Sequence, residues 1–214
     1  MTGRAIQGAT AGPLAALGSN MRAMVGLLGV LWAIEILDTI FLGSSLQRHG
    51  IHPRSWSGLW GIVTAPWLHG GWGHLLSNSG PLLVLGTLVL SRGRLVFAEA
   101  TTVVTLVAGL GTWLTGSSGS NHIGASSIVF GWFGYLVVAG WMARSLVDVA
   151  VAVVVTVLYG GIVWGVLPGQ PGVSWQGHLF GLVGGVIAAR AVAWAHGGST
   201  GADAATSDLA KRVR

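Results

Sequence analysis

The amino-acid sequence predicts an all-α, polytopic membrane protein with about six transmembrane helices. Apolar residues make up 52% of the 214 residues, charged residues only 8%, and the mean hydropathy is +0.71, whereas soluble domains carry about 25% charged residues. A transmembrane helix needs about 20 mainly apolar residues. The chain is therefore long enough for six spans joined by short loops, but too short for an additional soluble domain of ordinary size.

The apolar runs that are long enough to cross a bilayer define the expected helices. In chain order they cover residues 22–42, 74–91, 96–115, 126–143, 146–167 and 176–195. We expect a single membrane domain over 22–195, preceded by a short cytoplasmic segment, 1–21, and followed by a disordered basic tail, 196–214. The chain has no cysteine, which excludes disulfides, thiol catalysis and thiolate metal sites.

The basic residues predict the orientation of these spans. Of the eleven Lys and Arg residues, only Arg48 and Arg54 fall in segments assigned to one side of the membrane. The other nine fall on the opposite side: Arg4, Arg22, Arg92, Arg94, Arg144, Arg190, Lys211, Arg212 and Arg214. By the positive-inside rule both termini are cytoplasmic. Because the basic residues flank apolar spans and form no stripe, no nucleic-acid partner is expected; the expected location is a bacterial plasma membrane.

This orientation brings the polar residues of three spans to one depth. Helices two, four and six all begin on the extracytoplasmic side, and near their beginnings lie His74 and Asn78, Ser126, and His178. Polar groups inside a bilayer are costly unless they face the protein interior or a water-filled cavity. Each residue alone is more often a helix-packing contact than a catalytic group. Together they have the chemical types that acyl transfer requires.

Ser126 and His178 are the expected nucleophile and base. Ser126 opens helix four behind Gly124, whose backbone freedom suits a close approach, and His178 is the imidazole best placed to accept the serine proton. No acidic residue lies at that level, so we expect a dyad rather than a triad. Glycines at 177, 181 and 185 favour close packing of helix six on helix four. Phe130, one turn below Ser126, either stacks on the imidazole or belongs to the core.

A serine nucleophile also needs donors for the oxyanion of the tetrahedral intermediate. His74 and Asn78 are four residues apart and therefore share one face of helix two. We expect their side chains, with the backbone N–H of Ser126, to form this oxyanion site. His69 lies in the preceding loop and is expected to brace the region rather than to contact substrate.

At these residues the sequence resembles the rhomboid family of intramembrane serine proteases, across roughly residues 56–190. The motifs that carry the resemblance are His69-x4-His74-x3-Asn78, Gly124-Ala125-Ser126 at the start of the fourth helix, and His178-x2-Gly181-x3-Gly185 in the sixth. The resemblance implies a six-helix bundle with Ser126 as nucleophile, His178 as base and an oxyanion site at His74 and Asn78. It also implies cleavage of single-span membrane proteins near the membrane surface, with no metal or cofactor.

The sequence departs from the family pattern at three places. Ser127 follows the nucleophile where the family usually has Gly, Trp60-Gly61 stands where a Trp-Arg pair is usual, and Leu90 stands where an acidic residue is expected. The first change bears on the entry into helix four, and the other two on the anchoring of the first outer loop. A relative that binds membrane-protein clients without cutting them is therefore the main alternative. A transporter or channel is a third, disfavoured by the absence of a paired carboxylate or an inverted repeat.

The long first loop, residues 43–73, is expected to lie partly in the bilayer. It contains Trp56, Trp60, Trp67 and Trp72, and tryptophan favours the membrane interface. Glu35 and Asp38, at the outer end of helix one, are expected to reach water or a loop arginine such as Arg48, with no part in catalysis. The expected partners are the lipid bilayer and transmembrane substrates; the sequence leaves the oligomeric state undetermined.

Overall fold

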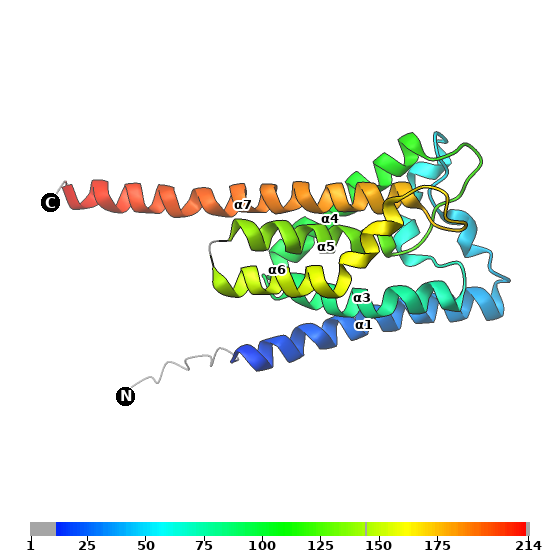
Figure 1. Ribbon diagram of the computed structural model, residues 1–214, viewed down its shortest axis with the longest axis horizontal. Helices are drawn as coiled ribbons and strands as arrows, with labels where there is room; N and C mark the ends of the chain where they lie inside the picture. The colour runs from blue at the N-terminus through cyan, green and yellow to red at the C-terminus, as the bar shows by residue number, and fades with distance from the viewer. Residues whose placement is uncertain (1–11, 144, 213–214) are drawn as a thin grey trace, which may run out of the picture.

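The computed structural model describes residues 12–143 and 145–212, with side chains up to residue 195, and within these residues it is helical with no β-strand. The long helices form an elongated bundle (Figure 1). They are α1 (Pro13–Phe41), α3 (Trp72–Leu90), α4 (Arg94–Thr115), α5 (Ser126–Met142), α6 (Leu146–Tyr159) and α7 (Trp175–Arg212). The shorter elements are η1 (Leu46–His49), η2 (Ser57–Leu59), α2 (Gly61–Thr64), η3 (Ala65–Trp67) and η4 (Gly160–Val166).

The observed helices follow the expected spans closely, with differences at three ends. α1 begins at Pro13 rather than at residue 22, because a proline is favoured in the first turn of a helix. The fifth span changes from α-helix to the 3₁₀ helix η4 at Gly160 and Gly161, where two poor helix formers adjoin. α7 continues past residue 195; side chains of the predicted tail, 196–214, lie outside the described residues, as does the segment 1–11.

Among the described residues, five helices are long and apolar enough to cross a membrane, counting α6 and η4 together. The fourth expected span, α5, has only 17 residues, about 25 Å at 1.5 Å per residue. It is shielded by its neighbours, since its buried residues run along most of its length. The structure therefore shows five candidate spans. The total of six spans, with α5 as the sixth, remains a prediction.

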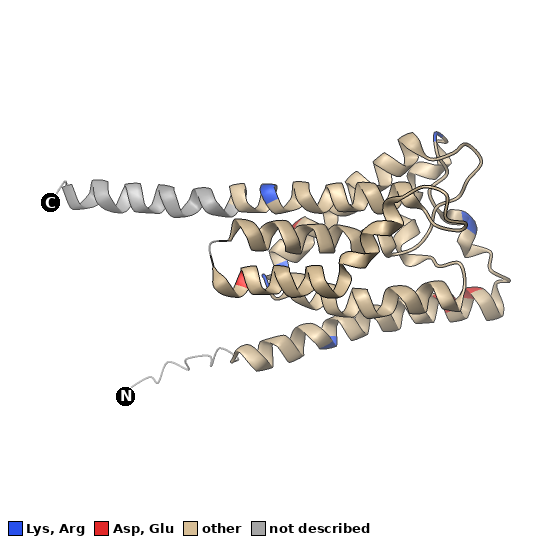
Figure 2. Cartoon of the chain, in the orientation of Figure 1, with Lys and Arg blue, Asp and Glu red and all other residues tan. Residues whose placement is uncertain are grey.

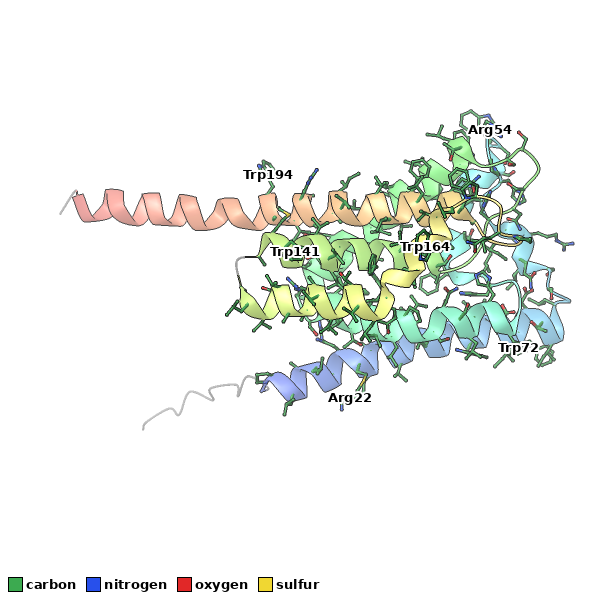
Figure 3. The ribbon with its side chains drawn as sticks, in the orientation of Figure 1. Arg22, Arg54, Trp72, Trp141, Trp164 and Trp194 are labelled. Carbon is green, nitrogen blue, oxygen red and sulfur yellow. The ribbon has the colours of Figure 1, made fainter. Side chains whose placement is uncertain are left out.

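The outer surface of the bundle has the character of a lipid-facing surface. Many large apolar side chains are exposed, among them Val157 and Leu146, and charged side chains are sparse over the bundle (Figure 2). Exposed tryptophans lie toward both ends: Trp72 toward one, Trp141 and Trp194 toward the other (Figure 3). Two levels of tryptophan are typical of the two interfaces of a bilayer.

Helix α7 packs closely on α5 because two glycines bring their backbones together. A Cβ at Gly181 would collide with the carbonyl oxygen of Ser127, and one at Gly185 with that of Gly131. The third glycine of the expected face, Gly177, lies instead against Ser174. The contact therefore holds the start of α7 against the start of α5, at the end of the bundle where the loops gather.

We call this end, formed by residues 42–71, 116–125 and 167–174, the loop end (Figure 1). The first and third loops are joined there by paired backbone hydrogen bonds between Ile51 and His122, of 2.9 and 3.0 Å. Arg54 donates to the carbonyl of Leu114 and to the hydroxyl of Ser118. These bonds anchor the first loop to α4 and the third loop, although the usual Trp-Arg pair is replaced by Trp60-Gly61.

Candidate active site

Ser126 and His178 are brought together at the loop end of the bundle. Ser126 is the first residue of α5 and His178 lies in the first turn of α7, so the close packing of these two helices sets the separation of the side chains. The Ser126 hydroxyl lies 2.8 Å from Nε2 of His178. This is hydrogen-bonding distance between a nucleophile and a base.

The other ring nitrogen of His178 determines the direction of this hydrogen bond. Nδ1 lies 2.9 Å from the backbone carbonyl oxygen of Gly165 in η4. A carbonyl can only accept, so Nδ1 must carry the proton. In neutral His178, Nε2 therefore has the lone pair and accepts from the Ser126 hydroxyl. The Gly165 carbonyl thus restrains the tautomer of the imidazole, as the carboxylate of a triad does. No sequence pattern indicates such a contact, because every residue has a carbonyl.

Phe130 stacks on the imidazole of His178, the first of the two arrangements considered from the sequence. The ring centroids are 4.1 Å apart and the planes differ by 10°. A Cβ at Gly165 would approach both rings, to 2.9 Å from Cζ of Phe130 and 3.0 Å from Nδ1 of His178. The imidazole is therefore fixed by a ring on one side and by a glycine backbone at its edge.

His74 is also held in one tautomer by the backbone. The N–H of Gly70 donates to Nδ1 of His74 at 3.3 Å, so in the neutral ring the proton must be on Nε2. Nε2 and Cε1 lie against Gly124, where a Cβ would come within 2.7 and 2.6 Å of them. Gly124 has φ +117°, which favours glycine, so its backbone makes room for a donor directed toward the start of α5.

Asn78 lies one turn below His74 on α3 and is buried. Among the described residues its Nδ2 has no hydrogen-bond partner. With His74, Ser126 and His178 it lines a cavity of about 220 Å³. The cavity therefore brings together a hydroxyl, an acceptor nitrogen and two N–H donors, which is the arrangement that acyl transfer uses.

His69 lies behind this cavity and contacts α5. The backbone N–H of Ala125 donates to its Nε2 at 3.4 Å, and its ring meets that of His74 edge to face at 5.1 Å. Burial, with a smaller contribution from His74, lowers the pKa of His69 to about 4. His69 is consequently neutral at physiological pH and connects the first loop to the residue before Ser126.

A second histidine network, which was not predicted from the sequence, adjoins the cavity. His122 of the third loop is 2.7 Å from the Ser174 hydroxyl and 2.8 Å from the Ser120 hydroxyl. Ser174 also accepts from the N–H of Gly177 in the first turn of α7. Burial lowers the pKa of His122, and His52 acts in the same direction. Neutral His122 thus links the third and fifth loops.

Ser127, in place of the usual Gly, leaves the contact between Ser126 and His178 intact. Ser127 is the second residue of α5, and its side chain faces a small cavity shared with Thr112 and Ser174.

Glu35 and Asp38 differ from expectation: both are buried, and neither forms an ion pair within the described part of the chain, while Arg48 is exposed. No group of three or more His, Asp or Glu side chains suited to a metal occurs among the described residues.

The fold and site define a helical integral membrane protein with a serine and a histidine paired inside the bundle. Residues 57–195 match the Rhomboid domain, and the chain belongs to the rhomboid family. It is 46% identical over 170 residues to an uncharacterized protein of Mycobacterium tuberculosis, covering 76% of this chain and 70% of that protein. An uncharacterized protein of Mycobacterium leprae is 40% identical over 184 residues, covering 79% of this chain and 72% of that protein.

A more distant relative carries a functional name. The Bacillus subtilis protein named "Putative rhomboid protease YdcA" is 26% identical over 132 residues, which cover 60% of this chain and 64% of that protein. Rhomboid membership indicates an intramembrane protease, and the mycobacterial and Bacillus relatives are bacterial proteins.

Proposed function

We propose that the protein is an intramembrane serine endopeptidase that cleaves single-span membrane proteins near the extracytoplasmic surface. The observation that carries the proposal is the 2.8 Å contact between Ser126 and His178, with the proton on His178 Nδ1 directed to Gly165. This arrangement leaves Nε2 as a base toward the serine hydroxyl. Family membership and the relative in Bacillus subtilis support the same assignment.

In the proposed reaction, Ser126 Oγ attacks the scissile carbonyl carbon while its proton passes to Nε2 of His178. The oxyanion accepts hydrogen bonds from Nε2–H of His74, Nδ2–H of Asn78 and the backbone N–H of Ser126, which lies in the first turn of α5 and has no acceptor within the helix. The C–N bond then breaks and His178 donates its proton to the departing amine. The carboxyl-side fragment leaves and the amino-side fragment remains as an ester on Ser126.

A second half-reaction needs water. His178 takes a proton from the water as the water oxygen attacks the ester carbonyl; the bond to Ser126 Oγ then breaks, His178 returns the proton to Oγ, and the amino-side fragment leaves as a carboxylic acid. The third and fifth loops supply a polar entrance: a cavity of about 480 Å³ at the loop end is lined by Ser120, Asn121, His122, Ser174 and His74. This entrance adjoins the cavity that contains the Ser126 and His178 side chains, since Ile123, Gly172 and Ser174 line both. By the positive-inside assignment the loop end faces the extracytoplasmic side.

The test is cleavage of a model single-span substrate in proteoliposomes by the wild type, Ser126→Ala and His178→Ala. Thermal unfolding is measured for each protein, and activities are compared only among proteins that unfold at the same temperature as the wild type. We expect the wild type to cut and both variants to lose activity by several orders of magnitude. Labelling of Ser126 by a fluorophosphonate provides a second readout. An inert wild type that still binds substrate and resists labelling would favour the binding-only alternative.

A further inference from the structure

His122 contacts the first and fifth loops, yet it takes no part in the bond-making steps proposed above. Its backbone pairs with Ile51 of the first loop through two hydrogen bonds, of 2.9 and 3.0 Å. Its side chain reaches Ser174 of the fifth loop, where Nδ1 lies 2.7 Å from the hydroxyl oxygen. His122 itself belongs to the third loop and stands four residues before Ser126. One residue therefore joins three segments of the loop end.

The hydrogen atoms of the His122 network can be assigned one after another. The Ser120 hydroxyl donates to the backbone carbonyl of Ser117 at 2.6 Å, so its oxygen must accept from Nε2 of His122, which lies 2.8 Å away. In neutral His122, Nε2 therefore carries the proton and Nδ1 has the lone pair. The hydroxyl of Ser174 must then donate to Nδ1, which leaves the Ser174 oxygen available as an acceptor.

Ser174 caps the first turn of α7. Its hydroxyl oxygen accepts from the backbone N–H of Gly177 at 3.3 Å, and its backbone carbonyl accepts from the N–H of His178 at 3.1 Å. This is the arrangement of a serine N-cap, which satisfies N–H groups that have no partner within the helix. A Cβ at Gly177 would lie 2.9 Å from the same hydroxyl oxygen, so the glycine leaves room for the serine side chain. The cap therefore holds the turn that carries the proposed base.

We propose that His122 is a positioning residue that acts through Ser174 to hold His178 against Ser126. Because Nδ1 of His122 accepts the hydrogen of the Ser174 hydroxyl, the oxygen of that hydroxyl stays directed at the N–H of Gly177. His122 lies in the segment that leads into Ser126, so this contact ties the helix of the base to the segment that carries the nucleophile. The inference rests on the roles proposed above for Ser126 and His178.

The activity test compares His122→Phe, which keeps a ring but has no acceptor, with His122→Asn, whose side-chain oxygen can accept from the Ser174 hydroxyl. We expect His122→Phe to lower kcat about tenfold with little change in KM, since a displacement of 1 Å costs about 10²-fold and loss of the contact permits part of that displacement. The matched control is Ser118→Ala, which removes another side-chain bond between the first and third loops, from Arg54, without changing the start of α7. His122→Asn and Ser118→Ala should stay within about threefold of the wild type, because the acceptor for Ser174 remains.

Changes at Ser174 test whether the effect passes through that serine. Ser174→Ala should lower kcat about tenfold, whereas Ser174→Thr keeps the hydroxyl and should stay within about threefold of the wild type. In the Ser174→Ala background, His122→Phe should cause little further loss, because the two changes remove one interaction. An equal loss in both backgrounds would overturn the proposal, since His122 would then act independently of Ser174. Equal activity of Ser174→Ala and the wild type would also overturn it, and this comparison decides the matter if His122→Phe does not fold.

Two measurements do not depend on proteolysis, so they separate this inference from the proposed function. Hydrogen exchange of the Gly177 amide in nanodiscs should be about fivefold faster in His122→Phe and Ser174→Ala than in the wild type, since one hydrogen bond is weakened or lost. The ring ¹⁵N shift of His178 Nε2 should change in the same two variants, and Ser118→Ala should leave both quantities unchanged.

The ring ¹⁵N shifts of His122 in the wild type test the direction of the network, for which we expect the Nε2–H tautomer. An Nδ1–H tautomer would overturn the proposal, because His122 would then donate to Ser174. Unchanged Gly177 exchange and unchanged His178 shifts in His122→Phe and Ser174→Ala would overturn it even if the wild type cleaves. The expected changes would support it even if no cleavage occurs.

Discussion

Replacement of Gly165 by alanine tests how closely the backbone of η4 controls the proposed base. The new Cβ would lie 2.9 Å from Cζ of Phe130 and 3.0 Å from Nδ1 of His178, whereas ordinary contacts begin near 3.4 Å. The neighbours must therefore move by about 0.4–0.5 Å. If His178 moves by that amount, its 2.8 Å contact with Ser126 lengthens toward the 3.5 Å limit of a hydrogen bond.

A displacement of 1 Å can cost about 10²-fold in rate, so half of it should lower kcat/KM roughly tenfold. The control is Gly161→Ala, in the same 3₁₀ helix, where a Cβ meets nothing within 4 Å. Initial rates in proteoliposomes, with thermal unfolding measured in parallel, compare the two variants. Equal activity of Gly165→Ala, Gly161→Ala and the wild type would refute the argument that Gly165 sets the position of the base.

Three further predictions concern other residues of the site. Gly181→Ala should lower cleavage about 10²-fold or more, because its Cβ would collide with the Ser127 carbonyl and separate α5 from α7; Gly80→Ala, with nothing within 4 Å, is its control. Ser127→Gly should keep cleavage within about fivefold of wild type and cost at most about 1 kcal/mol of unfolding free energy, since the serine side chain forms no hydrogen bond with Ser126 or His178 and glycine weakens helices. His69 has its pKa lowered from 6.5 to about 4 by burial, so its contribution to stability is complete above pH 6.5 and is lost as the pH falls toward 4. Over that interval the wild type should lose about 3 kcal/mol more unfolding free energy than His69→Gln in mixed micelles; parallel curves would contradict this.

The bundle could be predicted from the sequence because a helix that crosses a bilayer must consist mainly of apolar residues. Apolar runs of about 20 residues are recognisable without any neighbour, and α3 and α4 begin within two residues of their expected starts at 74 and 96. Two of the three glycines expected to form a packing face in the last helix, Gly181 and Gly185, lie where α7 approaches α5, whereas Gly177 does not. The proximity of Ser126 and His178 was predicted from their similar depth on parallel helices together with this glycine packing.

The features that orient the site could not be predicted, since they are made by the main chain. Gly165 and Gly70 hold the imidazoles through a carbonyl and an N–H that every such residue possesses. Which of them lies near a histidine depends on the 3₁₀ turn of η4 and on the loop before α3, neither of which has a clear periodicity. The short length of α5 could not be predicted either, because a helix that is covered by its neighbours need not be long enough to span the lipid itself.

These main-chain contacts also give a physical account of how the proposed dyad operates without a carboxylate. In a triad the acid holds the base in one tautomer and stabilises the imidazolium, but an unpaired carboxylate buried at membrane depth would be costly. A carbonyl supplies the tautomer restraint without introducing a charge. The Gly165 carbonyl can also remain bonded to protonated His178, since both ring nitrogens are then donors. Among the described residues the two buried acids are Glu35 and Asp38. Asp38 bonds instead to the backbone N–H of Leu46 in the first loop, which places its carboxyl oxygen where the backbone needs an acceptor.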